Sequence, residues 1–258
     1  MNKIQALLSD RKKNILTIYF TAGFPELNDT GRILKALQDG GADMVEVGIP
    51  FSDPIADGPT IQASNKVALE NGICVKMILE QLHAVKDEIK IPVILMGSLN
   101  PIYQYGMEKF CMEAAAAGVS GMIIPDLPME EYLNEYRDIF RKNNLVNIFL
   151  ISPQTPEERI RFIDENTEGF IYMVSAASTT GARKGISEEQ IAYFERVEKM
   201  NLKNPRLIGF GISDHETFSI ANGHAGGAII GSAFINLLSG SKDPEPDIKN
   251  YIKSVKGN

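Results

Sequence analysis

The sequence contains few of the residues that bind metals or form disulfides. It has only two cysteines, Cys74 and Cys111, and three histidines, His83, His215 and His224. The cysteines lie far apart, and neither they nor the histidines follow the spacing of a zinc or redox motif. Because clustered ligands mark metal sites, we predict that the protein holds no metal.

Long basic runs and long apolar runs are also missing. The 26 lysines and arginines face 33 acidic residues, a formal net charge of −7, so nucleic acid and anionic membranes are poor candidates for the main partner. The negative net charge does not exclude small anionic substrates, since backbone amides can bind them. No stretch reaches the ~20 apolar residues of a membrane helix, and MNKIQALLSDRKKN (1–14) does not resemble a signal peptide. These features predict a soluble cytoplasmic protein.

Short apolar runs alternate with longer amphipathic stretches along the chain. Most of the runs are continuous, as in parallel strands that are covered on both faces. Two of the stretches between them, TPEERIRFIDEN (155–166) and ISEEQIAYFERVEKM (186–200), open with a capping residue followed by acidic residues, which is a helix signal. The runs are ILTIYF (15–20), DMVEVG (43–48), IPVILM (91–96), SGMIIP (120–125), VNIFLI (146–151), GFIYMV (169–174), RLIGFG (206–211) and GGAIIG (226–231).

Eight strand–helix units in 258 residues, 44% of them hydrophobic, have the number and size of a (β/α)8 barrel, or TIM barrel. An open doubly wound sheet is the alternative. Such a sheet usually has fewer strands and a glycine-rich first turn, which YFTAGFPEL (19–27) lacks. No linker rich in serine or proline divides the chain, so we predict a single TIM-barrel domain over residues 1–258 with a short N-terminal helix.

Glu46 stands out because it lies in the middle of an apolar strand. Alternate strand residues share a face, so Val45 and Val47 suit the layer against the helices and Glu46 is expected to point into the barrel. Isolation from water raises the pKa of a carboxyl group, which suits proton exchange with a substrate. A buried ion pair is the alternative, but the only basic residue in another strand candidate is Arg206, at its very start. We therefore predict a catalytic role for Glu46.

The following loop carries Asp53 and Asp57 among the prolines Pro50, Pro54 and Pro59. TIM barrels keep their active sites in such loops, and prolines restrict the backbone in a way that helps to hold a carboxylate in place. Loop aspartates also form turns by binding nearby backbone. Spacing alone does not separate these two interpretations.

Glycine-containing loops follow the last three strands: SAASTTGARKGIS (175–187), GFGIS (209–213) and GSAF (231–234). Barrels that bind phosphate often use the loops after strands seven and eight, together with a helix N-terminus. Exposed amides and the helix dipole attract the dianion there. The loops together predict a phosphate site. The long loop after the sixth strand is expected to act as a lid, with an ordinary surface loop as the alternative.

These segments together resemble the α subunit family of tryptophan synthase, in order from about residue 4 to about residue 240. The resemblance implies a retro-aldol lyase that cleaves indole-3-glycerol phosphate into indole and glyceraldehyde 3-phosphate, without a metal or organic cofactor in this subunit. The matching segments are YFTAGFP (19–25), VEVGIPFSDPIADGPTIQ (45–62), IIPDLPMEE (123–131), GFIYMVS (169–175), TTGAR (179–183), IGFGIS (208–213) and AIIGSAF (228–234).

The resemblance also implies roles for individual residues. Glu46 would be the general acid/base that serves ring carbon C3 and the side-chain hydroxyl, and Asp57 would accept the indole N–H. Ordinary barrel core is the alternative for the ring-pocket aromatics. The implied substrate-binding residues are Phe20 and Tyr172 at the ring, Thr180 in the lid, and Gly181, Phe210, Gly211, Gly231 and Ser232 at the phosphate.

A partner follows from the same resemblance. The family works as an α2β2 complex, in which indole passes to a β subunit that holds pyridoxal phosphate. The loop SLNPIYQYG (98–106) has the apolar and aromatic composition of an interface, although an ordinary packed loop is the alternative. The residues that match partner-facing segments are Asp53, Pro54, Asn100 and Pro101.

Other interpretations stay open, because a fold and a phosphate site do not fix the chemistry. One is a weakly catalytic regulatory subunit that activates a β subunit, and another is a different phosphate-binding TIM-barrel lyase or isomerase. The chain also departs from the family near the pocket and the lid, which leaves substrate affinity and subunit coupling undetermined. The departures are Ser98, Leu99, Ala176 and Thr179.

Overall fold

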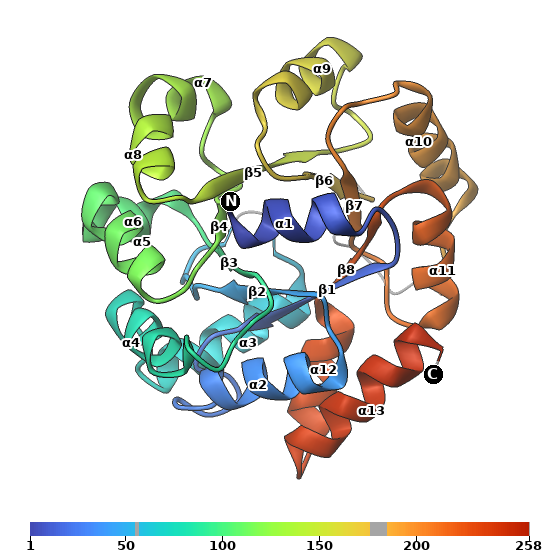
Figure 1. The fold of residues 1–258 in the computed structure, drawn as a ribbon. Coiled ribbons are helices and arrows are strands. Elements are labelled where there is room, and N and C mark those ends of the chain that lie inside the picture. The colour runs from blue at the N-terminus through green and yellow to red at the C-terminus, as the bar shows by residue number, and fades with distance from the viewer. Residues whose placement is uncertain (55–56, 176–184, 258) are drawn as a thin grey trace.

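Eight parallel strands close into a barrel in which every strand pairs with its neighbour in sequence and β8 pairs with β1 (Figure 1). The computed structural model describes residues 1–54, 57–175 and 185–257. The predicted TIM barrel is confirmed. The strands are β1 Ile15–Thr21, β2 Met44–Gly48, β3 Val93–Met96, β4 Gly121–Ile123, β5 Val146–Ile151, β6 Ile171–Val174, β7 Arg206–Gly209 and β8 Gly227–Ile230.

Helices surround the barrel, and α1 (Lys3–Asp10) lies across its N-terminal end (Figure 1). No helix in the described ranges is long and apolar enough to cross a membrane. The outer helices are α2 Thr30–Gly40, α3 Pro59–Glu70, α4 Val75–Val85, α5 Leu99–Tyr105, α6 Met107–Ala116, α7 Met129–Glu131, the π-helical turn Tyr132–Tyr136, α8 Arg137–Lys142, α9 Glu157–Asn166, α10 Glu188–Lys199, α11 His215–His224, α12 Ser232–Gly240 and α13 Pro244–Lys256.

The core has two parts, separated by the barrel wall. The inner part contains Met44 and Ile94 from the strands, together with Ile4 and Leu8 of α1. The larger part lies between strands and helices and includes residues such as Val45. Because successive strand residues point to opposite faces, each strand contributes to both parts. A polar residue on an inward position is therefore enclosed by apolar side chains.

Asp43, just before β2, joins both ends of the chain to the barrel. Its carboxylate accepts hydrogen bonds from the backbone N–H of Leu16 at 2.8 Å and from Lys256 Nζ of α13 at 2.9 Å. It also pairs with Arg11, which follows α1. The Asp43 side chain is only 11% exposed, so these charge-assisted bonds are largely shielded from water.

We expect Asp43→Ala to lower the free energy of unfolding by about 2 kcal/mol, because buried donors and two cations lose their acceptor. Asp39→Ala is the matched control, since Asp39 pairs with Lys249 at 3.1 Å on the exposed surface. That change should cost under about 1 kcal/mol. Denaturant unfolding of the two variants measures the difference, and equal losses would contradict an anchoring role for Asp43.

Candidate active site

Glu46 lies at the centre of β2 and points into the barrel. In the strand register it pairs with Tyr19 of β1 and Ile94 of β3, and Ile94 belongs to the inner core. The Glu46 side chain is 0% exposed, and neither carboxylate oxygen has a hydrogen-bond partner among the described residues. Burial raises the pKa of Glu46 to about 8 from its ordinary value of 4.5. At neutral pH this carboxyl group holds a proton that it can donate.

Two tyrosines face Glu46 across the inside of the barrel. Tyr19 is its register partner on β1, and Tyr172 lies on β6 within the inner core. Burial raises the pKa of both hydroxyls, and the carboxyl groups of Glu46 and Asp57 raise them further. Electrostatic effects between these side chains require that they lie close together. We refer to Tyr19, Glu46, Asp57 and Tyr172 as the mouth cluster.

Glycines beside the mouth cluster make room for the tyrosine rings. A Cβ atom added at Gly48, two residues beyond Glu46, would lie 2.2 Å from the Tyr19 hydroxyl. One added at Gly209 of β7 would lie 2.3 Å from the Tyr172 hydroxyl. Both distances are far below van der Waals contact, so only glycine fits at these strand ends.

Asp57 lies immediately before α3, in the loop after β2. Its Oδ2 accepts a hydrogen bond from Asn65 Nδ2 at 3.0 Å, and its carbonyl accepts one from Gln62 Nε2 at 2.8 Å. Burial raises the pKa of Asp57, and the Asn65 hydrogen bond acts in the opposite direction. Asp57 and Tyr19 line the same pocket, together with Met96 at the end of β3 and other residues of the barrel mouth.

The structure does not bring Phe20 to the mouth cluster. Phe20 pairs in register with Val47 and lies with it in the outer core, fully buried beneath the helices. Its neighbour Tyr19 occupies the inward position. The expectation that Phe20 lines the ring pocket is therefore corrected: a shift of one residue along a strand exchanges the two faces, and Tyr19 is the aromatic beside Glu46.

The predicted phosphate loop after β7 adjoins Tyr172. The Phe210 ring packs edge-on against Tyr172, with ring centroids 6.3 Å apart. Phe210 and Gly211 both have left-handed backbone conformations, with φ of 68° and 78°, which is unusual for phenylalanine and common at functional turns. The Phe210 carbonyl accepts a hydrogen bond from Ser175 Oγ, which also accepts one from Gln190 Nε2 at 3.2 Å. These bonds hold the turn in place.

The third loop leads into a helix. Gly231 is the N-cap residue of α12, and Ser232 is its first residue. The first amides of a helix have no acceptor within it, and the dipole there favours an anion. A Cβ atom at Gly231 would lie 3.5 Å from the Tyr19 ring, so this loop also borders the mouth cluster. Thr180 and Gly181 lie outside the described residues, as do the positions of two departures from the family (176 and 179).

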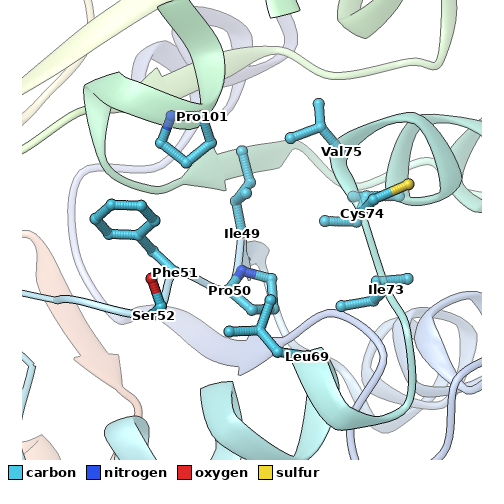
Figure 2. A pocket seen from close by; sticks show the side chains of 10 residues that line it. Ile49, Pro50, Phe51, Ser52, Leu69, Ile73, Cys74, Val75 and Pro101 are labelled. Carbon is cyan, nitrogen blue, oxygen red and sulfur yellow. The ribbon is translucent and has the colours of Figure 1, made fainter. Parts of the chain in front are cut away.

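A separate apolar hollow of ≈ 260 Å³ lies beside the loop after β2. Figure 2 shows Phe51 and Pro101 on one side of it and Cys74 and Val75 on the other. Pro101 belongs to α5, and its neighbour Asn100 is exposed. Asp53 is exposed as well, and Pro54 is partly exposed. The predicted partner-facing residues thus come from the loop after β2 and from α5, which follows the adjacent strand β3.

Sequence reasoning missed Tyr19, Asn65 and the two glycines under the tyrosine rings. A signal for Tyr19 was present, since it occupies the inward phase of β1 once that strand is aligned with β2. Asn65 could have been suspected because it lies among the buried positions of an amphipathic helix. The roles of Gly48 and Gly209 depend on rings from other strands, so no local pattern indicated them.

Comparison with known proteins gives a consistent result along the whole chain. A model of the family described as "Tryptophan synthase alpha chain" matches residues 5–257. The curated tryptophan synthase alpha chain of Parabacteroides distasonis is 54% identical over 256 residues, covering 99% of this chain and 100% of the relative. That of Flavobacterium johnsoniae is 55% identical over 241 residues, covering 93% and 95%.

Solved structures are similar as well. The tryptophan synthase alpha chain from Legionella pneumophila has a TM-score of 0.88 and 34% identity, covering 100% of this chain and 97% of that one. A structure described as the tryptophan synthase a2b2 complex from Pyrococcus furiosus contains a chain with a TM-score of 0.87 and 35% identity. It covers 96% of this chain and 100% of that one.

Burial of Glu46 predicts a dependence of stability on pH. The ordinary pKa of the carboxyl group is 4.5 and the folded value is about 8, so between them the folded protein keeps a proton that the unfolded chain has lost. Stability therefore falls as pH rises through this range. Glu46→Gln lacks this pH dependence and should exceed the native chain in stability by about 4–5 kcal/mol at pH 8.5.

Denaturant unfolding at pH 5 and pH 8.5 measures this difference. At pH 5 the difference should be under about 1 kcal/mol, because this pH lies only slightly above the ordinary pKa of 4.5, at which the unfolded chain begins to lose the proton. The same difference at both pH values would show that the carboxyl group is not held apart from water.

Proposed function

The chain belongs to the tryptophan synthase alpha chain family, and we propose that it cleaves indole-3-glycerol phosphate into indole and glyceraldehyde 3-phosphate through its mouth cluster. The observation that carries the assignment of this site is the fully buried carboxyl group of Glu46, which points into the barrel and has no hydrogen-bond partner among the described residues. A desolvated acid with a pKa near neutrality exchanges protons efficiently.

The proposed reaction moves one proton onto the ring and removes one from the side chain. Glu46 donates its proton to ring carbon C3, and Asp57 accepts a hydrogen bond from the ring N–H, which carries the resulting positive charge. Glu46, now ionised, takes the proton of the side-chain hydroxyl. The C–C bond then breaks, its electron pair restores the aromatic ring, and the hydroxyl carbon becomes the aldehyde of glyceraldehyde 3-phosphate.

We place the indole ring between Tyr19 and Tyr172, and the phosphate at the turns after β7 and β8. Rings above and below the substrate fit the preference of aromatic side chains for stacked or edge-on packing. The amides of Gly211, Gly231 and Ser232 lie in loops that border both tyrosines, and Phe210 packs beside Tyr172. Thr180 and Gly181 complete this site by the family resemblance alone.

We further propose that the chain assembles with a tryptophan synthase β subunit, and that pyridoxal phosphate belongs to this partner while the chain itself uses no metal or organic cofactor. The related Pyrococcus furiosus chain is described in an a2b2 complex. The proposed contact residues lie at the barrel mouth, where indole would leave: Asp53 and Pro54 in the loop after β2, and Asn100 and Pro101 in α5. Both cysteines are free, which fits a reducing cytoplasm, the location we propose.

An indole-release assay tests the proposal, with and without a β subunit. Glu46→Gln and Asp57→Asn should each lower kcat at least about 100-fold, the usual range for a lost acid/base group. Glu70→Gln, at an exposed site paired with Lys66, is the matched control and should keep full activity. Full turnover by Glu46→Gln would rule out its proton-transfer role, and no indole from the native chain under either condition would refute the function.

A pair of neighbouring variants tests the assignment of the ring pocket. Tyr19→Leu should raise KM about 5-fold, because an aromatic contact of roughly 1 kcal/mol is lost. Phe20→Leu should leave KM unchanged and lower stability by about 1–2 kcal/mol, since Phe20 fills the outer core. Steady-state kinetics and denaturant unfolding distinguish the two effects. A KM that responds to the change at Phe20 alone would restore the original expectation.

A further inference from the structure

Helix α3 buries polar side chains where a core-facing helix normally buries apolar ones. Ser64 and Asn65 are 1% and 4% exposed. Buried polar groups are costly unless they are hydrogen-bonded, and each has such a bond. Ser64 Oγ lies 2.7 Å from Thr21 Oγ1 at the end of β1, and Asn65 Nδ2 lies 3.0 Å from Asp57 Oδ2. The polar face of α3 is therefore directed at the barrel mouth.

Asp57 is held at two points by this helix. Gln62 and Asn65 are three residues apart and so lie on the same side of α3. Gln62 Nε2 donates to the Asp57 carbonyl, and Asn65 Nδ2 donates to the carboxylate. The first bond fixes the backbone of residue 57, and the second fixes the rotation of its side chain.

We propose that Asn65 is a positioning residue for Asp57, holding its carboxylate ionised and turned so that Oδ1 receives the substrate's ring N–H. This inference rests on the proposed function. The Asn65 hydrogen bond uses Oδ2 alone, and Oδ1 accepts no bond from any residue within the described ranges. An amide N–H favours an ionised acceptor over a protonated one, so the same bond also opposes the uptake of a proton.

The described surroundings of Asp57 offer no positively charged group that would keep its carboxylate ionised. The titratable groups that face it are Tyr19 from β1, Glu46 from β2, Tyr172 from β6 and Asp126 from the loop after β4. All are acidic or neutral, and no lysine, arginine or histidine lines the pocket within the described chain. Burial raises the pKa of Asp57, and among the described residues the Asn65 hydrogen bond is the one influence that lowers it.

The oxygen of the Asn65 side-chain amide makes it possible to test the positioning role without a large change in stability. Asn65 Oδ1 is buried without a partner among the described residues. Leucine has nearly the same shape and no polar atoms, so Asn65→Leu removes an unsatisfied oxygen together with the donor and should leave stability nearly unchanged. Gln81 of α4 offers a matched control. Its Nε2 donates to the Leu27 carbonyl at 2.9 Å, and its Oε1 is likewise buried and unpartnered.

The kinetic test compares Asn65→Leu with Gln81→Met in indole release as a function of pH. Asn65→Leu should lower kcat/KM near neutral pH by up to about 100-fold, the cost of a misplaced reactive group. The acid limb of its profile should move to higher pH, because Asp57 must be ionised and now binds its proton more tightly. Gln81→Met should keep the native profile. An unchanged profile in Asn65→Leu would overturn the proposal.

Carboxyl carbon NMR titration of Asp57 gives a measurement that needs no activity. The Asp57 signal, assigned by its loss in Asp57→Asn, should titrate at higher pH in Asn65→Leu than in the native chain. If Asn65→Leu does not fold, Asn65→Asp keeps the size, removes the donor and should shift the titration in the same direction. Identical Asp57 titrations would overturn the positioning role even if the chain cleaves indole-3-glycerol phosphate. A shifted titration without cleavage would place the failure in the proposed function.

Discussion

The barrel encloses one carboxyl group, Glu46, that forms no hydrogen bond with any described residue. Alternation along β2 turns this side chain inward, and closure of the eight strands removes it from water. Desolvation disfavours its charged form, so the fold itself sets the acidity of the group. The other features of the site surround this carboxyl group: the glycines under the two tyrosine rings, the polar face of α3, and the turns after β7 and β8.

Much of this architecture follows from patterns that the chain carries locally. Continuous apolar runs between capped amphipathic segments indicated eight parallel strands, and the valines on either side of Glu46 indicated which way it points. β1 carries a weaker signal, because its two neighbouring aromatic residues, Tyr19 and Phe20, both suit a buried strand. Tyr19 shares a face with Thr17 and Thr21, and its pairing with Glu46 of β2 shows that this face is the inward one.

Other features depend on contacts between distant segments and leave no local signal. Asp43 looks like an ordinary residue before a strand, yet it binds groups from both ends of the chain. Asn65 looks like a polar interruption of a helix until Asp57 is seen beside it. In both cases the sequence contains a polar residue at a costly position. The reason for that cost becomes visible only in three dimensions.

The position of α1 determines from which end of the barrel a small molecule can reach Glu46. Ile4 and Leu8 lie in the inner core, so α1 covers the N-terminal end of the barrel. With this end covered in the described part of the chain, substrate and product of the proposed reaction would enter and leave at the opposite end, by the mouth cluster. Docking of another protein over that end would therefore alter how readily Glu46 exchanges its proton with solvent.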